Sequence, residues 1–489
     1  MIKSAAIELL KTFSKDEMKE FSVFINSPFH NTNKSIVKSF DVLKKYYPGF
    51  DNKFLSKEIL YRKVFPGKQY NEQTVKSILF NLTKLSEEFL TYKRFLNNPI
   101  LRQFELVGEI LDRNKFELAD KYFKDYEKML NDSNGITEEF FKDKMDFESL
   151  KVQMNFRKDS PQATLENIYN QADYHIRFSL MRLSNFIHDL KTNEIVFNAV
   201  YKHGFIEEFI SNLNLEETLS HLEKNFTQSY NEVTAIYVLR ILFYLNPKEE
   251  KYFYQMKELF IKNINVFHHH EIYNHFQILE GVCWVLQKEV NREKFERELY
   301  ELYILRLEKG VYSPDQKYMR VILYRAIFVI TMKYKDFKYI ENYIDTYIEK
   351  LLPEHRVNMR NYSNALLYFE KREFEKSLGY SIKINFELFA FRYDIRQLMF
   401  KVYYELGYFE EALSLIDTHR HFISNNKTVS ERYKELHTNF LKYYSILLKI
   451  KMGNTGLEPE LIRRKISDEN NLVEKEWLLS KADEFLKDK

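Results

Sequence analysis

Glycine and proline are scarce in this chain: its 489 residues include only 11 Gly and 9 Pro. Average usage is roughly 7% for glycine and 5% for proline, which is several-fold higher. Tight turns depend on these two residue types, because glycine accepts a positive φ and proline fixes its own φ. A chain so poor in both is most simply built of helices joined by short polar connections. The sequence therefore predicts an all-α fold.

Composition and charge narrow the class of protein further. Hydrophobic residues make up 45% of the chain and charged residues 30%, which is typical of an ordered globular protein. Lys and Arg total 74 against 71 Asp and Glu, a net charge of +3. A balance so close to neutral produces no general attraction to nucleic acid or to an acidic membrane surface. We therefore expect neither to be the partner of the chain as a whole.

The single cysteine and the N-terminal residues indicate where the protein works. Cys283 alone cannot form an internal disulfide, which fits a reducing compartment. Residues 1–25 contain no apolar core followed by a small-residue cleavage site. No segment approaches the ~20 uninterrupted apolar residues that a membrane span needs. We expect a cytoplasmic protein without membrane insertion.

The first 97 residues predict a small bundle of four helices. Ser14 and Glu17 have the spacing of a capping box, in which each side chain accepts a hydrogen bond from the backbone of the other. The helix that they begin should end near residues 26–31, because Pro28 lacks an N–H and disfavours helical conformation in the residue before it. The other three helices are expected at 33–46, 55–65 and 71–96.

The rest of the chain predicts further helices in two segments. Residues 98–425 are expected to form helix pairs, although the sequence does not define their register between 130 and 320. Within this segment, 113–130 is the clearest early unit, and 158–190 is expected to form two helices after Pro161. Residues 426–489 are expected to cover the last hydrophobic face as a C-terminal cap, with Trp477, Leu478 and Leu479 on an apolar side.

A repeated pattern becomes legible after residue 320. The segments 333–344, 370–381 and 405–416 align on a central aromatic residue, and these aromatics are 37 and 35 residues apart: Phe337, Phe374 and Phe409. Two helices of ~13–15 residues with two short turns occupy about this length, and the spacing is near the ~34 residues of a tetratricopeptide repeat. The residue three positions after each aromatic is Ile340, Ser377 and Ala412.

The stretch YYELGYFEEALSLI resembles the tetratricopeptide-repeat (TPR) pattern. Tyr403 matches the aromatic of the first helix, Gly407 the glycine between the helices, Phe409 the first aromatic of the second helix and Ala412 its small residue. The stretch RNKFELADKYF matches in the same way at Phe116 and Ala119.

The match is limited to about 100–120 residues near the C-terminus and to the isolated unit near 116. Ile340 is larger than the small residue of the pattern, and Arg372 stands where a turn glycine is expected. The resemblance implies a right-handed superhelix of helix pairs, here with an N-terminal bundle and a C-terminal cap. It identifies no particular functional subfamily.

The resemblance also implies a function and a set of contact residues. TPR arrays bind extended peptides or partner helices on a concave face lined by the first helix of each pair. In phase with Gly407, and with the preceding pairs, the predicted binding residues are Arg325, Tyr362, Asp394, Gln397, Lys401 and Tyr404. We expect a non-catalytic scaffold or adaptor that binds a protein partner and needs no cofactor. Packing between turns of the superhelix is the alternative role for apolar positions of this face.

The stretch VFHHHEIYNHF, residues 266–276, is the only one that suggests a metal site. A zincin needs two histidines four residues apart around a glutamate, but His270 is followed at that spacing by Asn274. Glu271 and His275 do lie four residues apart and are weak candidates for a metal or for a hydrogen bond. The alternative is a solvated histidine segment with one half-buried member, and we favour it over a metal-dependent enzyme.

Other catalytic signals are missing from the sequence. It contains no G-x-x-x-x-G-K-[ST], G-x-G-x-x-G or G-x-S-x-G motif. Cys283 lies beside Trp284 in an apolar helical stretch, where a cysteine is more often inert packing than a nucleophile. We do not expect an enzyme.

A nucleic-acid-binding regulator is the second alternative. The predicted helices 55–65 and 71–96 could form a helix-turn-helix, with Lys68, Lys76 and Lys84 near phosphates. Glu87 and Glu88 lie on the same long helix, whose clearest feature is an apolar stripe. A packed bundle is therefore the favoured interpretation of this segment.

Overall fold

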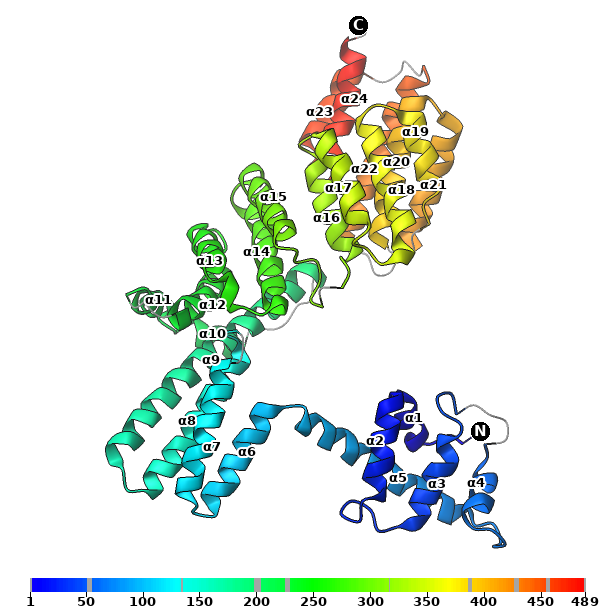
Figure 1. Cartoon of the computed structure of the whole chain (residues 1–489). Coiled ribbons are helices and arrows are strands. Elements are labelled where there is room, and N and C mark those ends of the chain that lie inside the picture. Colours follow the sequence, from blue (N-terminus) through cyan, green and yellow to red (C-terminus); the bar gives the residue numbers. More distant parts are fainter. Residues whose placement is uncertain are drawn as a thin grey trace. The chain divides into compact units, whose positions relative to one another are not determined.

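The fold is helical throughout the part of the chain that the structure describes. A computed structural model describes residues 2–50, 55–132, 135–197, 204–224, 229–315, 317–385, 389–425, 431–453 and 458–487. Within these ranges every regular element is a helix, and the only strand-like pairing is an isolated bridge between Met319 and Leu351. The predicted all-α class is confirmed (Figure 1).

The chain divides into two compact units. The first comprises Met1–Ser133 and Glu139–Ile176, and the second comprises Asn134–Glu138 and Arg177–Lys489. The predicted segment bounds at 97 and 425 stay predictions. The second of them adjoins residues 426–430, which lie outside the described residues.

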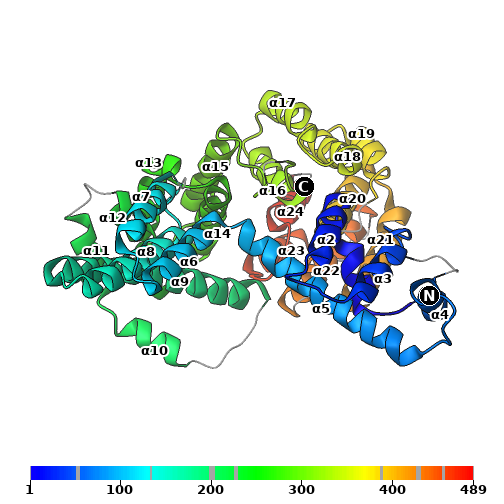
Figure 2. The same ribbon diagram turned by 60° about the horizontal axis from the view of Figure 1, so that its bottom comes forward.

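The first unit begins with five helices around a phenylalanine-rich core, one more than the four predicted, because a helix over Ala5–Thr12 precedes Ser14. In Figure 2 α2 and α3 lie next to α5, and Phe21 and Phe40 meet edge to face at 5.1 Å between ring centroids. The predicted capping box is confirmed: the Ser14 Oγ accepts from the Glu17 N–H at 3.1 Å, and the Glu17 carboxylate accepts from the Ser14 N–H at 2.8 Å. The helices are α1 (Ala5–Thr12), α2 (Lys15–Asn26), α3 (Lys34–Lys44), α4 (Lys57–Val64) and α5 (Glu72–Leu96).

Three further helices and the start of a fourth complete the first unit. They are α6 (Pro99–Asp112), α7 (Phe116–Asp132), α8 (Glu138–Arg157) and α9 (Pro161–Phe197). The expectation of two helices in 158–190 is wrong, because α9 is one helix of 37 residues. The physical reason is that no glycine or proline follows Pro161 until Gly204, so nothing in the sequence breaks the helix.

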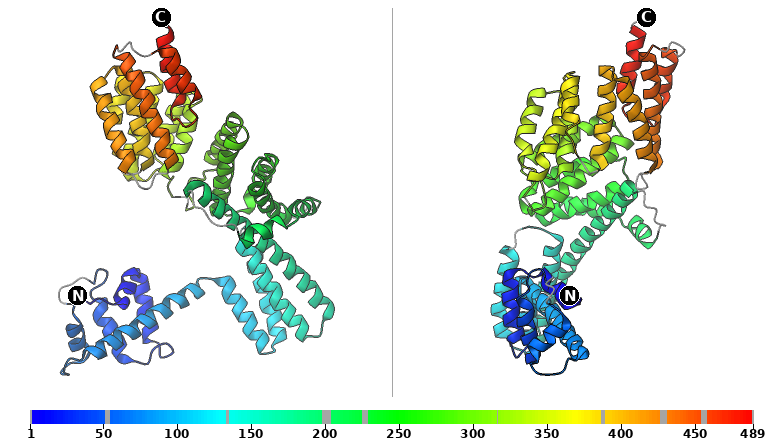
Figure 3. Two further views of the ribbon diagram at one scale, coloured as in Figure 1. Left: turned by 180° about the vertical axis from the view of Figure 1, so that it is seen from behind. Right: turned by 90° about the vertical axis from the view of Figure 1, so that its right-hand side faces the viewer.

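The second unit continues with helices that pack in sequence order, as Figure 3 shows for α12 to α15. Residues 231–243 of α12 are all buried, and nine of these thirteen residues are apolar. Its buried Arg240 donates to the Ser184 Oγ at 2.6 Å and to the Asn185 Oδ1 at 2.5 Å, both on α9. The helices are α10 (Phe205–Ser211), α11 (Leu215–Glu223), α12 (Ser229–Leu245), α13 (Lys251–Lys262), the short η1 (Ile264–Val266), α14 (His269–Glu289) and α15 (Arg292–Glu308).

The C-terminal part of the second unit contains three consecutive helix pairs and three closing helices. The pairs are α16 (Val321–Met332) with α17 (Phe337–Ile348), α18 (Pro353–Glu370) with α19 (Phe374–Ser381), and α20 (Phe389–Leu406) with α21 (Phe409–Asn425). The closing helices are α22 (Glu431–Lys451), α23 (Pro459–Asp468) and α24 (Lys475–Lys487). They share a hydrophobic core with α20 and α21 that includes Phe400, Ile416 and Leu478.

The aromatic residues that align in the sequence have equivalent places in the structure. Phe337, Phe374 and Phe409 are each the first residue of the second helix of a pair. The residue three positions later is 0% exposed in every case, whether it is Ile340, Ser377 or Ala412. Full burial at this position therefore does not require a small side chain. In the first unit, α7 likewise begins at Phe116, with Ala119 0% exposed.

The turns before these helices also share a backbone conformation. The residue two positions before the aromatic has a left-handed φ: +57° at Asn114, +54° at Lys335, +64° at Arg372 and +71° at Gly407. After Arg372 and Gly407 the next backbone N–H bonds to the carbonyl five residues earlier, at 2.8 and 2.9 Å. This is the hydrogen bond of a Schellman motif, which ends a helix with a left-handed residue. Arg372 thus adopts the conformation of the glycine that it replaces.

We expect Arg372→Gly to raise the free energy of unfolding by about 0.5 kcal/mol and Gly407→Ala to lower it by about 1 kcal/mol. A left-handed conformation strains a residue with a Cβ and leaves glycine unstrained. At Gly407 an added Cβ would meet only the Phe409 ring, at 3.8 Å, so conformation and not crowding sets the cost. Urea unfolding followed by circular dichroism measures both variants. A less stable Arg372→Gly variant would argue against this account of the turns.

Candidate functional site

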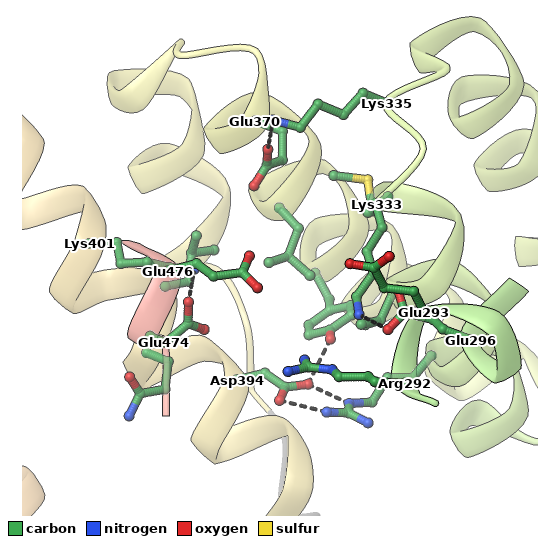
Figure 4. A pocket seen from close by; sticks show the side chains of 17 residues that line it. Arg292, Glu293, Glu296, Lys333, Lys335, Glu370, Asp394, Lys401, Glu474 and Glu476 are labelled. Carbon is green, nitrogen blue, oxygen red and sulfur yellow. Dashed lines mark hydrogen bonds and ion pairs between the residues drawn. The ribbon is translucent and has the colours of Figure 1, made fainter. Parts of the chain in front are cut away.

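A cavity of about 740 Å³ lies among α15, α16, α18, α20 and the start of α24. We call it the charged cavity, because its wall carries five cations and six carboxylates. The cations are Arg292, Arg325, Lys333, Lys335 and Lys401, and the carboxylates are Glu293, Glu296, Glu370, Asp394, Glu474 and Glu476. Figure 4 shows these side chains around the opening.

Helical spacing explains why so many side chains of one helix reach the charged cavity. The wall receives residues 394, 397, 398 and 401 from α20, and residues 325, 329 and 332 from α16. Apart from the neighbours 397 and 398, these positions are three, four or seven residues apart, so they lie on one face of each helix. Residues 362, 366 and 370 of α18 complete the wall between them.

A carboxylate joins the first helices of the three pairs. The Arg325 Nη2 on α16 donates to the Asp394 Oδ1 on α20 at 2.7 Å, and the Arg325 Nε donates to the other carboxylate oxygen. The Tyr362 hydroxyl on α18 also donates to Asp394, at 2.7 Å. One half-buried aspartate thus connects α16, α18 and α20 (Figure 4).

The pKa values of this group favour a structural role. Burial alone would lower the pKa of Arg325, but the hydrogen bonds and charge of Asp394 outweigh it and raise that pKa. Burial, with the charge of Asp394, raises the pKa of Tyr362 well above its usual value. Both residues therefore keep their protons at physiological pH and donate to Asp394.

We expect Tyr362→Phe to lower the free energy of unfolding by about 1.5 to 2 kcal/mol, because a hydrogen bond to a charged group is lost inside the wall. Tyr347→Phe is the matched control on α17, since no hydrogen bond of its hydroxyl is present among the described residues. Its expected change is within about 0.5 kcal/mol. Thermal or urea unfolding measures both variants, and equal losses would contradict a specific role for the Tyr362 hydroxyl.

Most of the other charges in the wall are paired. Three lysine Nζ atoms lie close to a glutamate carboxylate oxygen. The distances are 2.6 Å from Lys333 to Glu296, 3.4 Å from Lys335 to Glu370 and 3.0 Å from Lys401 to Glu474. The described residues provide no ion-pair partner for Arg292, Glu293 or Glu476, and all three are exposed. In Figure 4 the side chains of Arg292 and Glu476 point into the opening.

A smaller, largely apolar pocket of about 210 Å³ shares part of this wall. We call it the apolar pocket. It lies between α14, α15 and α16, and its apolar lining is Trp284, Leu299, Tyr303, Ala326, Val329 and Ile330. Trp284 is 58% exposed, whereas Leu299 and Tyr303 are buried. The apolar pocket thus opens to solvent beside an exposed tryptophan.

Five of the six predicted binding residues line the charged cavity: Arg325, Tyr362, Asp394, Gln397 and Lys401. Gln397 is largely buried and its amide nitrogen lies 3.0 Å from the His437 Nδ1. Tyr404 is placed differently. It is 1% exposed and packs against Trp477 of α24 at 5.2 Å between ring centroids, so it has no access to the cavity. The binding role of all six stays a prediction.

No pattern in the sequence points to Arg292, Trp284 or Glu476 as lining residues. Arg292 and Trp284 lie before residue 320, where the repeat register is not legible, and Glu476 lies on a closing helix that returns to the wall. Trp284 also occurs in an apolar stretch that predicted packing. Its neighbour Cys283 is indeed buried, and burial raises the pKa of the Cys283 thiol.

The side chains of the histidine segment make structural contacts. The Glu271 carboxylate accepts from the His268 backbone N–H at 3.3 Å as part of a helix cap, and burial raises the pKa of Glu271 to about 7. The ring of His275 is 5% exposed and packs against Phe267 and Phe260, at 4.6 and 5.1 Å between centroids. The described ranges contain no group of three His, Cys, Asp or Glu residues placed to hold a metal.

The three lysines considered for phosphate contacts have neighbours within the first unit. Lys76 lies 3.3 Å from Glu72 and Lys84 lies 2.9 Å from Glu87. The Lys68 ammonium lies 5.7 Å from the centroid of the Phe65 ring. Pairing with carboxylates weakens the positive potential that a phosphate would meet.

No helix in the described part of the chain is both long and apolar enough to cross a membrane. Comparison of the chain with protein-family models, with curated proteins and with solved structures finds no match.

Proposed function

We propose that this chain is a non-catalytic scaffold or adaptor that binds a segment of another protein in the charged cavity. The observation that carries the proposal is the shared wall: the first helices of three consecutive pairs present one face each to the same opening. A mixture of paired charges, exposed charges and exposed apolar side chains suits recognition of a peptide or a partner helix.

We also propose that these pairs are TPR-like repeats. Three shared features support this assignment. The second helix of each pair starts at an equivalent aromatic residue, Phe337, Phe374 or Phe409, the residue three positions later is fully buried, and each turn contains a left-handed residue. In this proposal the helices α22 to α24 cap the array, and Trp477 covers the end of the concave face at Tyr404. The single buried Cys283 supports a location in the cytoplasm.

The chemistry of the cavity supports binding over catalysis. A general acid or base works best when its pKa lies near the operating pH. Arg325 and Tyr362 instead have raised pKa values that keep them protonated, and both hold the same carboxylate. Arg325 and Tyr362 therefore set the charge and the shape of the cavity wall, and they do not exchange protons near neutral pH.

Affinity capture from a cell lysate tests the proposal. The cavity variant carries Glu293→Lys and Glu476→Lys, two exposed carboxylates without an ion-pair partner in the described chain. The control carries Glu258→Lys and Glu308→Lys, which change the net charge equally at exposed positions outside the cavity wall. We expect a partner that wild type and control capture equally and that the cavity variant captures in a clearly different amount, as quantified by mass spectrometry. Equal capture by all three proteins would contradict a role for the cavity.

A further inference from the structure

We propose that the apolar pocket and Arg292 together select the partner segment: one apolar side chain enters the pocket, and an adjacent aspartate or glutamate pairs with Arg292. This inference rests on the proposed function and names the chemistry that the site recognises. It concerns a part of the wall that the repeat pattern did not indicate.

The size of the apolar pocket fits a single side chain. An apolar cavity of about 150 Å³ is large enough to hold benzene, and this pocket measures about 210 Å³. Its floor is rigid, since Leu299 and Tyr303 are buried at 1% and 3% exposure. Its rim carries Trp284 at 58% and Val329 at 37% exposure. Exposed aromatic residues beside a pocket are common centres of binding energy.

The charges around the apolar pocket favour an anion. Its lining includes three cations, Arg292, Arg325 and Lys333, and one carboxylate, Glu296. Arg325 is bound to Asp394 and Lys333 to Glu296, so their charges are compensated. Arg292 has no such partner among the described residues. A guanidinium binds a carboxylate through two parallel hydrogen bonds, which makes this arginine the expected contact for an acidic side chain.

A second polar group supports an acceptor on the ligand. The side-chain amide nitrogen of Gln287, in the same lining, is buried and makes no hydrogen bond within the described chain. A buried donor without a partner is costly. A carbonyl or carboxylate oxygen of a bound segment would satisfy it.

Selection from a library of random ten-residue peptides displayed on phage, with the full chain immobilised, tests the inference. We expect enriched peptides to carry Leu, Ile, Met or Phe within two positions of Asp or Glu. One enriched peptide is then synthesised with a fluorescent label, together with a version in which the acidic residue is lysine. Fluorescence polarisation compares their affinities for wild type and for Arg292→Glu.

The Arg292→Glu variant should bind the acidic peptide at least 10-fold more weakly than wild type does. It should bind the lysine peptide more tightly than wild type does. Arg297→Glu is the matched control, because Arg297 lies on the same helix, is 79% exposed at its side chain and is outside the lining. It should change the affinity less than two-fold. Trp284→Ala should also weaken the acidic peptide, and circular dichroism checks that the variants fold.

The outcomes separate this inference from the proposed function. The inference would be overturned by peptides that bind in the charged cavity without the apolar–acidic pair. It would also be overturned if Arg292→Glu left the affinity of the peptides unchanged. Either result would leave the proposed function standing. A selection that enriches no peptide, or only peptides indifferent to Arg292→Glu, Trp284→Ala and the Glu293→Lys/Glu476→Lys variant, would overturn both.

Discussion

Replacing Glu280 by alanine is expected to lower the free energy of unfolding by about 3 to 5 kcal/mol, the usual cost of leaving one member of a buried ion pair without its partner. Glu280 on α14 pairs with Arg306 on α15, whose side chain is 1% exposed. The Arg306 Nε also donates to the Val311 carbonyl at 2.9 Å, and its guanidinium lies 4.6 Å from the Tyr273 ring. The remaining cation would be buried without a carboxylate partner.

Two controls identify the ion pair as the cause. Glu289→Ala removes an exposed carboxylate from the same helix and should change the free energy of unfolding by less than about 0.5 kcal/mol. A double variant with methionine at both Glu280 and Arg306 removes both charges and should recover most of the loss. Urea unfolding followed by tryptophan fluorescence measures all three. A double variant no more stable than Glu280→Ala would show that packing, not the unpaired charge, sets the cost.

The same pair matters for the candidate site. Trp284 lies one helical turn after Glu280 on α14, and Arg292 begins α15. The buried pair therefore holds together the two helices that carry Trp284 and Arg292. A site built on helices that are fixed by buried contacts presents its side chains with little ordering cost on binding.

The second large effect is a loss of stability in acid. Burial lowers the pKa of His188 and His437 to about 4, and that of His275 and His419 to about 3. In the unfolded chain a histidine has a pKa of about 6.5. Between these values the unfolded chain binds more protons than the folded one. The free energy of unfolding therefore falls as the pH falls below about 6.5, by about 2 kcal/mol per histidine at about pH 5.

His419 offers the cleanest test of this pH dependence. It is 0% exposed, and the charges of His437 and Arg396 add to the effect of burial on its pKa. We expect His419→Leu to remove about 2 kcal/mol of the difference in unfolding free energy between about pH 7.5 and about pH 5. His421→Leu, at an exposed position of the same helix, should leave that difference unchanged. Urea unfolding at the two pH values gives the comparison.

Carboxyl groups with raised pKa values oppose the histidines, which is why the test uses a single variant. Burial raises the pKa of Asp143 to about 6 and also raises that of Glu280. Burial raises the pKa of Glu271 to about 7, so acidification stabilises the folded form at this position. In the wild-type chain, the total loss of unfolding free energy on acidification is therefore smaller than the sum of the losses from the four histidines. An identical pH difference in wild type and His419→Leu would contradict neutral burial of His419.

Local sequence signals predicted much of the helical structure. The Ser14 and Glu17 capping box and the stop before Pro28 depend on neighbouring residues alone, and both occur as expected. Phe337, Phe374 and Phe409 mark helix starts for the same reason. Arg372 was a departure from the pattern, yet it adopts the expected turn. The strain of its left-handed conformation is only about 1 kcal/mol, which packing of the flanking helices can offset.

Contacts between distant segments could not be predicted from local signals. Tyr404 has the spacing of a lining residue, but whether it faces solvent depends on Trp477, more than 70 residues later in the chain. Arg325 and Asp394 were both selected as binding residues, although each is the other's partner. Sequence periodicity shows which face of a helix a residue lies on. It does not show which other helix covers that face.

Site-specific photo-crosslinking tests the central claim most directly. A photoreactive amino acid replaces Val329, which lines both the charged cavity and the apolar pocket and is 37% exposed. The control position is Leu413 on α21, which is equally exposed at 37% and lies outside both linings. Irradiation of cells that express each variant should yield a crosslinked partner protein at Val329 and none at Leu413. Crosslinks of equal yield and identity at both positions, or at Leu413 alone, would contradict binding in the cavity.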